Sequence, residues 1–135
     1  MADMVAFELV SPTALVLSEE VEMVVVPGGD GDFGVLPGHT PLLSTVRPGV
    51  IDIHEGGKVA RSLFVDGGFA EVTPERVVVL SEEVIPVADL SADTAEARLQ
   101  EATQELSTAD DEVHKRIAER KVAIAEAMKA ALERR

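Results

Sequence analysis

The chain has 135 residues, of which 46% are hydrophobic and only 3% aromatic, with a formal net charge of −13 and no cysteine. This length fits one domain or one domain with a small appendage, and the missing cysteines exclude a disulfide framework and thiolate metal sites. The acidic charge argues against a nucleic-acid-binding protein, which needs a basic surface. No apolar run approaches the ~20 residues of a membrane-spanning helix, so we expect no direct insertion into a bilayer.

From Val5 to about Val87, short runs of β-type residues alternate with turn signals, and all 10 Gly and all 7 Pro lie in this part. Strands at this spacing, with no helical segment between them, predict an all-β sandwich or flattened barrel over residues 1–87. Runs such as 14–17 and 77–80 are continuously apolar. We interpret them as strands buried between two sheets.

The first candidate motif, residues 29–34, follows the apolar run 21–26 and literally matches the G-x-G-x-x-G fingerprint of dinucleotide-binding folds. That fingerprint needs a following helix whose N-terminus holds a pyrophosphate. Here two prolines follow shortly afterwards, and two carboxylates stand where the phosphate would lie. The glycines therefore indicate a tight turn, and no cofactor is expected.

His39 lies near Asp32 and Ser44 in the sequence, which suggests a hydrolase triad, but no G-x-S-x-G elbow is present. His54 and His114 make no metal-ligand spacing with it. We interpret His39 as a loop histidine that binds backbone or touches a partner. We expect no catalytic residue, so the chain is not an enzyme, and we expect no metal site.

After Pro86 the composition changes to Ala, Glu, Arg, Lys, Gln and Leu, and apolar residues recur at helical spacing. This pattern predicts a second domain over residues 88–135, an α-helical hairpin of two antiparallel helices. Asp93 is expected to cap the first helix, with Glu96 as its acidic partner three residues later.

The polar cluster 107–111 contains no true helix breaker, so a hairpin and one long bent helix remain alternatives. Residues 89–112 carry one basic and eight acidic side chains, whereas residues 113–135 carry seven basic and three acidic ones. An antiparallel hairpin would lay these two segments together in a favourable but salt-sensitive pairing. A long helix would instead offer its cationic end to an acidic partner.

Residues 34–44, Gly-Val-Leu-Pro-Gly-His-Thr-Pro-Leu-Leu-Ser, resemble the G-x-x-P-G-H-x-P-L-L signature of the epsilon subunits of F-type ATP synthases. Residues 8–12, 47–50 and 66–72 fit the same family, so the resemblance covers essentially the whole chain. It implies a two-sheet sandwich followed by a helical hairpin. It also implies a non-catalytic central-stalk subunit that binds the gamma subunit and the c-ring and couples proton-driven rotation to ATP synthesis at the alpha/beta sites.

By position, the loop 30–39 resembles the face that meets the polar loops of the c-ring. The candidate contact residues are Asp30, Asp32, Gly34 and His39, and the turn-shaping residues are Pro37, Gly38 and Pro41. An acidic, stiff loop suits docking against basic groups, because its prolines lower the cost of ordering it. A purely turn-shaping role is the alternative for the first of these prolines and for Gly34.

In many family members the C-terminal helices swing from a compact to an extended arrangement, reach acidic segments of the beta subunits and restrain ATP hydrolysis. The candidates for such a basic face are Lys115, Arg116, Arg120, Lys121, Lys129, Arg134 and Arg135. A solvated cationic face is the simpler interpretation of any single residue. Their confinement to one helix favours a role for the set.

Some members bind ATP through an Ile/Leu-Asp-x-x-Arg-Ala motif at the start of the first helix. If Arg98 is the arginine, Ala95 stands at the aspartate position; if Asp89 is the aspartate, Ala92 stands at the arginine position. We therefore expect weak or absent ATP binding by the isolated chain.

From its first residues we expect neither a secretory signal nor an Arg- and Ser-rich transit-like segment. We expect a peripheral protein on the cytoplasmic side of a bacterial inner membrane, as part of the ATP synthase, with a plastid-encoded origin as the alternative. The alternative function is a free-standing β-sandwich adaptor, an interaction protein unrelated to rotary catalysis.

Overall fold

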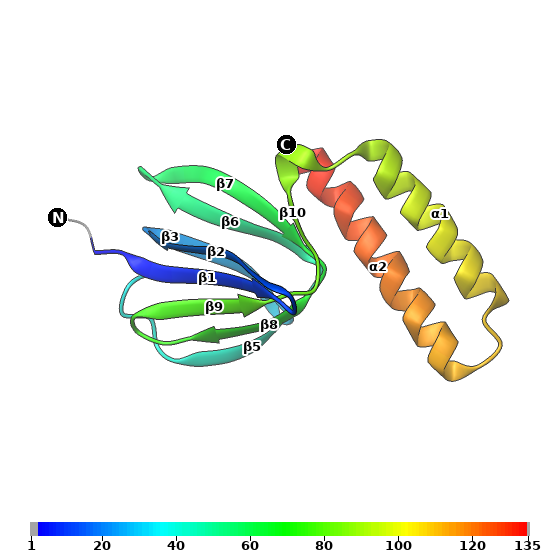
Figure 1. Ribbon diagram of the computed structural model, residues 1–135, viewed down its shortest axis with the longest axis horizontal. Helices are drawn as coiled ribbons and strands as arrows, with labels where there is room; N and C mark the ends of the chain where they lie inside the picture. Colours follow the sequence, from blue (N-terminus) through cyan, green and yellow to red (C-terminus); the bar gives the residue numbers. More distant parts are fainter. Residues whose placement is uncertain (1–2, 135) are drawn as a thin grey trace. The chain divides into compact units, whose positions relative to one another are not determined.

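The computed structural model describes residues 3–134, and the chain divides into two compact units, Met1–Pro86 and Val87–Arg135. Figure 1 shows that the first unit consists of strands and the second of helices. The predicted fold class, a β-sandwich or flattened barrel followed by a helical hairpin, is confirmed.

Within residues 3–134, ten strands form one continuous hydrogen-bonded sheet. It folds into two layers, one with the order β10-β7-β6-β3-β4 and one with the order β5-β8-β9-β1-β2, joined where Gly28 pairs with Val46. Neighbouring strands are antiparallel except β1 and β9, which are parallel. The bounds are β1 Val5–Ser11, β2 Ala14–Val21, β3 Met23–Gly28, β4 Gly31–Val35, β5 Leu42–Val46, β6 Gly49–Glu55, β7 Lys58–Val65, β8 Gly68–Val72, β9 Arg76–Leu80 and β10 Val84–Pro86.

The core follows from the pleat of the strands, which sends alternate side chains to opposite faces. In β1, for example, Val5, Phe7 and Leu9 are fully buried. The prediction that the runs 14–17 and 77–80 are strands buried between two sheets is wrong. In 77–80 only Val77 and Val79 are buried. In 14–17 Leu15 and Val16 are exposed, and only Leu17 packs partly against the core.

The strand register places the connecting loops at two opposite ends of the sandwich. In the β3–β4 hairpin, Gly28 pairs with Gly31 at one end and Val24 with Val35 at the other. At roughly 3.3 Å per residue, the two ends of this hairpin lie ~13 Å apart. We call the end at which Gly28 pairs with Gly31 the Gly28 end. The opposite end, which holds the loop 36–41, is the far end.

The helical unit contains the 3₁₀ turn η1 (Val87–Asp89) and two helices, α1 (Ala92–Thr108) and α2 (Glu112–Arg134). The polar cluster separates the helices because Asp111 caps α2. Its Oδ1 accepts a hydrogen bond from the backbone N–H of His114 at 2.8 Å. The hairpin is thus the arrangement present. None of the helices in the described part of the chain is long and apolar enough to cross a membrane.

The prediction that Asp93 caps α1 is wrong, because Ser91 is the N-cap. The Ser91 Oγ accepts a hydrogen bond from the N–H of Thr94 at 3.3 Å, and its backbone is extended, as a cap requires. Leu90 before the cap and Ala95 at the fourth helical position are both buried, the pattern of a hydrophobic staple that sets where the helix begins. Asp93 lies instead in the first turn, where its charge suits the positive helix end.

Candidate partner-binding surface

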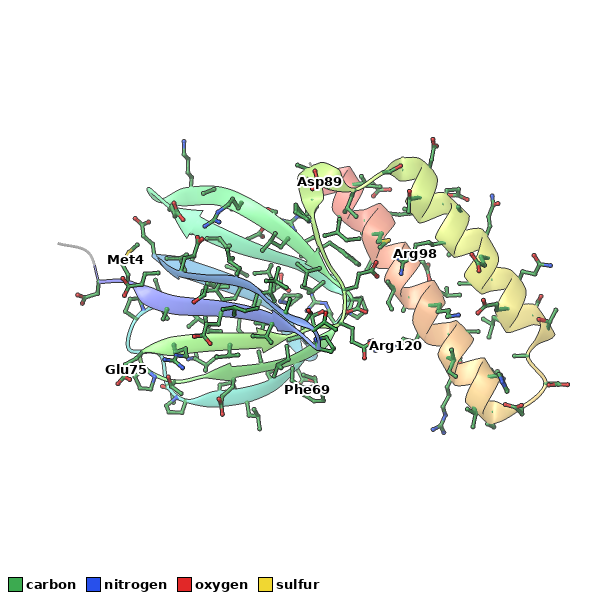
Figure 2. All side chains as sticks on the ribbon, in the orientation of Figure 1. Met4, Phe69, Glu75, Asp89, Arg98 and Arg120 are labelled. Atoms are coloured by element: carbon green, nitrogen blue, oxygen red, sulfur yellow. The ribbon has the colours of Figure 1, made fainter. Side chains whose placement is uncertain are left out.

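An apolar row crosses the outer face of the second layer near the Gly28 end. The register aligns Phe69 of β8 with Leu80 of β9, and then with Val10 of β1 and Leu15 of β2. The exposed fraction is 58% for Phe69, 50% for Leu80 and 61% for Leu15. In Figure 2 the Phe69 side chain projects from the layer of β5, β8 and β9. We call these four residues the apolar row.

A glycine positions the aromatic member of this row. Gly68 has φ +132°, and a Cβ there would lie 1.8 Å from the carbonyl oxygen of Leu80. Only glycine combines this backbone conformation with so close an approach. The contact brings β8 against β9 and sets Phe69 opposite Leu80 on the outer face.

The next row on the same face is mixed in character. It aligns Leu43, Glu71, Val78 and Glu8, and Leu43 is 75% exposed. Arg76 lies beside it, with its Nη1 4.0 Å from the Glu8 Oε1. An apolar strip bordered by charged side chains is the usual anatomy of a protein–protein interface. The bordering carboxylates favour a partner that presents cations around an apolar ridge.

The glycine motif is a tight β-hairpin turn, as predicted, at the Gly28 end. Arg47 holds the turn by donating from Nη1 to the carbonyl oxygen of Gly28 at 2.6 Å and from Nη2 to the Asp32 Oδ1 at 2.5 Å. The Gly29 N–H donates to the carbonyl oxygen of Thr45 at 2.9 Å. A Cβ on Gly29 would lie 2.2 Å from the Thr45 Oγ1, so the turn packs closely against β5.

The loop 36–41 contains a type II turn over residues 36–39. The backbone N–H of His39 closes this turn by donating to the carbonyl oxygen of Leu36 at 3.1 Å. Pro37 occupies the second position, and Gly38, with φ +82°, the third, as this turn type requires. The Gly38 N–H also donates to the carbonyl oxygen of Pro74 at 2.8 Å. Pro41 leads into β5.

The structure does not bring the predicted loop residues together. Asp30 and Asp32 lie at the Gly28 end, Gly34 lies on β4, and His39 lies at the far end. The ring Nδ1 of His39 is 2.6 Å from the carbonyl oxygen of Thr40, where an N–H donates. The two carboxylates and the histidine are therefore separated by the length of β4, ~13 Å, which a standard protein–protein interface can span.

The basic residues all belong to α2, apart from Arg135, which lies outside the described residues. Two of them form ion pairs with α1: Lys121 Nζ lies 3.0 Å from Glu105 Oε2, and Lys129 Nζ lies 2.8 Å from Glu96 Oε2. The hydrogen bond from Lys129 holds the pKa of Glu96 below its ordinary value, and the same bond raises the pKa of Lys129. The predicted pairing of the acidic helix with the basic one is confirmed. The remaining members on α2 are Lys115, Arg116, Arg120 and Arg134.

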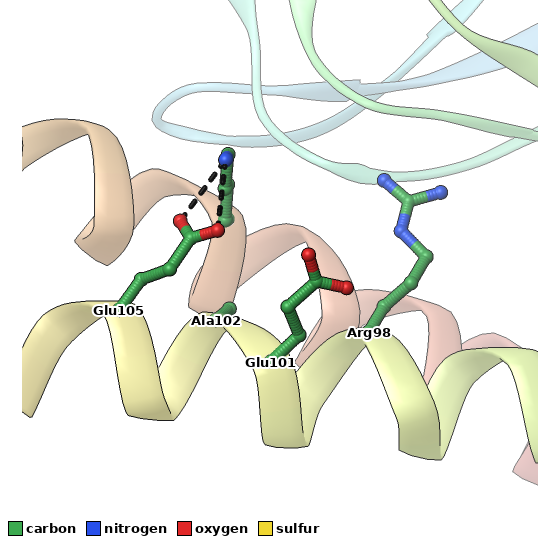
Figure 3. Close-up of a pocket in the computed structure, with 5 residues that line it drawn as sticks. Arg98, Glu101, Ala102 and Glu105 are labelled. Atoms are coloured by element: carbon green, nitrogen blue, oxygen red, sulfur yellow. Dashed lines mark hydrogen bonds and ion pairs between the residues drawn. The ribbon is translucent and has the colours of Figure 1, made fainter.

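A small hollow of about 170 Å³ lies between the two helices (Figure 3). Arg98, Glu101, Ala102, Glu105 and Lys121 line it. Its volume falls below the roughly 300 Å³ at which ligand pockets begin. Among residues 3–134, no group of three or more His, Asp or Glu side chains is placed so that it could hold a metal ion.

Inference from the sequence alone missed the apolar row. A signal was present, because the run 77–80 is apolar at both odd and even positions. A strand with one solvated face alternates apolar and polar residues. Apolar residues at both odd and even positions of the run 77–80 therefore indicate that its outer face is also covered by another surface. Arg47 was noted within the motif 47–50, but its part in holding the turn depends on contacts with β3 and β4.

Residues 4–87 match the family described as ATP synthase, Delta/Epsilon chain, beta-sandwich domain. The chain is 56% identical over 132 residues to the ATP synthase epsilon chain of Paramagnetospirillum magneticum, covering 98% of this chain and 99% of that protein. It is 57% identical over 131 residues to the ATP synthase epsilon chain of Rhodospirillum rubrum, covering 97% and 98%.

Two solved structures have the same fold. A chain in the cryo-EM structure of the Euglena gracilis mitochondrial ATP synthase, containing OSCP, F1 and the c-ring, is 27% identical with a TM-score of 0.80, covering 96% of this chain and 81% of that one. A chain in the Tetrahymena thermophila mitochondrial ATP synthase central stalk and c-ring has a TM-score of 0.71 at 14% identity, covering 95% and 96%.

Proposed function

The chain belongs to the ATP synthase epsilon chain family and is a non-catalytic central-stalk subunit, and we propose that it binds the gamma subunit and the c-ring and couples proton-driven rotation to ATP synthesis. In this role it catalyses no reaction and transmits torque. A torque-transmitting subunit needs stiff, extended contacts, which a two-layer sandwich with close-packed turns provides.

The apolar row is the observation that carries the gamma assignment. Phe69, Leu80 and Leu15 lie side by side and are each at least half exposed. A permanent partner that covers them removes apolar surface from water, and aromatic residues are frequent anchors of such interfaces. Glu71 and Glu8 border the row and favour basic groups on the gamma side.

For the c-ring contact we propose the turn at the Gly28 end, with Asp30 and Asp32 as its charged residues. The hydrogen bonds from Arg47 hold this turn in one conformation, which lowers the entropic cost of docking. His39 lies ~13 Å away along β4, and Gly34 lies on that strand.

For the helices we propose restraint of ATP hydrolysis through contact of the basic residues of α2 with the alpha/beta subunits. Concentration of cations on one helix supports this role, since it suits an acidic partner. We propose no bound ATP, because the start of α1 lacks the ATP-binding motif. The subunit then works on the cytoplasmic side of a bacterial inner membrane, peripheral to it.

One comparison tests these proposals together. The catalytic sector is assembled with the full-length chain and with a chain lacking residues 89–135, and ATP hydrolysis and copurification with gamma are measured. We expect both chains to copurify with gamma and the shorter one to give faster hydrolysis. Equal hydrolysis rates would refute the inhibitory role. Failure of both chains to copurify with gamma would refute the stalk role and favour a free-standing adaptor.

A further inference from the structure

A buried polar cluster lies beside the apolar row at the Gly28 end. Asp66, in the connection from β7 to β8, is 7% exposed, and Ser81, in the connection from β9 to β10, is 4% exposed. The Asp66 Oδ1 accepts hydrogen bonds from the Ser81 Oγ at 2.8 Å and from the backbone N–H of Glu83 at 3.1 Å. The backbone N–H of Asp66 also donates to the carbonyl oxygen of Glu83 at 3.2 Å. One residue thus ties two connections of the sandwich to each other.

This cluster is linked to three members of the apolar row. Phe69 follows Asp66 closely in the chain, and Leu80 directly precedes Ser81. The backbone N–H of Ser81 donates to the carbonyl oxygen of Val10 at 2.9 Å, which holds β9 against β1 at this end. The alignment of these three apolar residues on the outer face therefore depends on hydrogen bonds made within the cluster.

The chain between Asp66 and Phe69 has little stiffness of its own. Gly67 and Gly68 have φ +116° and +132°, and glycine loses more conformational freedom on folding than any other residue. An anchor directly before the two glycines fixes where β8 begins. Burying a carboxyl group costs free energy unless hydrogen bonds satisfy it, and an apolar side chain would avoid that cost. A buried residue that departs from the apolar rule points to a functional role.

We propose that Asp66 is a positioning residue for the partner-binding surface, whose carboxylate keeps Phe69, Leu80 and Val10 in the alignment that the partner recognises. The identity of that partner as gamma rests on the proposed function, whereas the alignment does not. A surface that is aligned before binding loses less entropy on docking. The apparent dissociation constant rises in inverse proportion to the fraction of molecules in which the row is aligned.

Hydrogen exchange of the isolated full-length chain tests the alignment without a partner. The reporter is the backbone N–H of Ser81, which bonds to Val10 at the Gly28 end. The reference is the backbone N–H of Ala6, which donates to the carbonyl oxygen of Glu75 at 3.1 Å and joins β1 to the start of β9 at the far end. In Asp66→Ala we expect exchange of the reporter to accelerate about tenfold and that of the reference to change less than about twofold.

This difference is expected because the substitution removes hydrogen bonds only from the connections near Ser81. Equal acceleration of both amides would show a general loss of stability and would overturn the positioning role. Unchanged exchange of the reporter would overturn it as well.

Titration with purified gamma measures the consequence for binding, with urea unfolding to establish that each variant is folded. We expect Asp66→Ala to raise the dissociation constant about tenfold, since an aligned fraction of about one tenth has that effect. Asp66→Asn keeps a side-chain oxygen that can accept both hydrogen bonds, so it should bind within about twofold of the parent. If Asp66→Ala does not fold, Ser81→Ala replaces it, with a rise of about threefold because it removes one of the donors.

The matched control is Asp52→Ala. It removes another carboxylate that accepts from a serine hydroxyl, the Ser62 Oγ at 2.7 Å, but this pair joins β6 to β7 in the other layer. We expect the control to bind gamma as the parent does. An equal loss of affinity in the control and in Asp66→Ala would overturn the proposal.

The Phe69→Ala variant separates this proposal from the assignment of gamma to the row. Parent-like affinity of Asp66→Ala, together with weakened binding of Phe69→Ala, would overturn the positioning role and leave the gamma assignment intact. Parent-like affinity of Phe69→Ala would refute the gamma assignment, and exchange of the Ser81 amide then decides the alignment alone. Binding by Asp66→Asn that is as weak as that of Asp66→Ala would refute positioning through the hydrogen bonds.

Discussion

Replacing Phe69 with alanine should weaken binding to gamma far more than it weakens the fold. A phenylalanine covers roughly 150–250 Å² when fully buried. Because 58% of Phe69 is exposed, a partner can remove about 115 Å² from water, which at roughly 25 cal/mol per Å² amounts to about 3 kcal/mol. That difference corresponds to about a hundredfold rise in the dissociation constant.

The assay is isothermal titration of the isolated chain with purified gamma, accompanied by urea unfolding of each variant. Val59→Ala is the matched control, because Val59 on β7 is 46% exposed and lies outside the apolar row. We expect the control to bind gamma with the affinity of the parent. A folded Phe69→Ala chain whose affinity changes less than about twofold would refute the assignment of the row to gamma.

Three further predictions concern the isolated chain. Gly68→Ala should destabilise the sandwich by about 3 kcal/mol or more in urea unfolding, because its Cβ would overlap the carbonyl of Leu80; unchanged stability would show that β8 and β9 separate easily. Arg47→Ala should leave the fold intact but speed proteolytic cleavage at the 29–30 turn, which loses two hydrogen bonds, and equal cleavage would mean that the turn is held without the Arg47 side chain. Acidification should reduce helix stability measured by circular dichroism. The hydrogen bond from Lys129 lowers the pKa of Glu96, and the hydrogen bonds from His114 lower the pKa of Asp111. The stabilisation by these two carboxylates is therefore present above their ordinary pKa values of 4.5 and 3.8, and it is lost as the pH falls through the lower pKa values of the folded chain. A melting temperature that stays constant through this pH range would contradict the prediction.

The fold class was predictable because its signals are local. Turn residues at short intervals mark strands, and a Gly- and Pro-free segment with apolar residues at helical spacing marks helices. The tight turn at residues 29–30 was predictable for the same reason. The helix cap was misplaced by two residues, because both Ser91 and Asp93 are good capping residues and the choice depends on the burial of Leu90.

The binding surface was less accessible to sequence analysis, because it depends on which strands become neighbours. Phe69, Leu80, Val10 and Leu15 come from four strands, and one of the pairings is the parallel contact of β9 with β1. No local pattern encodes that contact. The positions of the candidate c-ring residues at the two ends and in the middle of β4 likewise follow from strand pairing.

The central claim is that gamma covers the apolar row in the assembled enzyme. A photoreactive maleimide attached at Leu80→Cys, the single thiol in this cysteine-free chain, tests it directly in the purified ATP synthase. We predict that illumination joins this subunit to gamma in high yield, whereas the same label at Val59→Cys gives little of that product. Crosslinking of the Leu80→Cys label to any other subunit, or to none, would contradict the account.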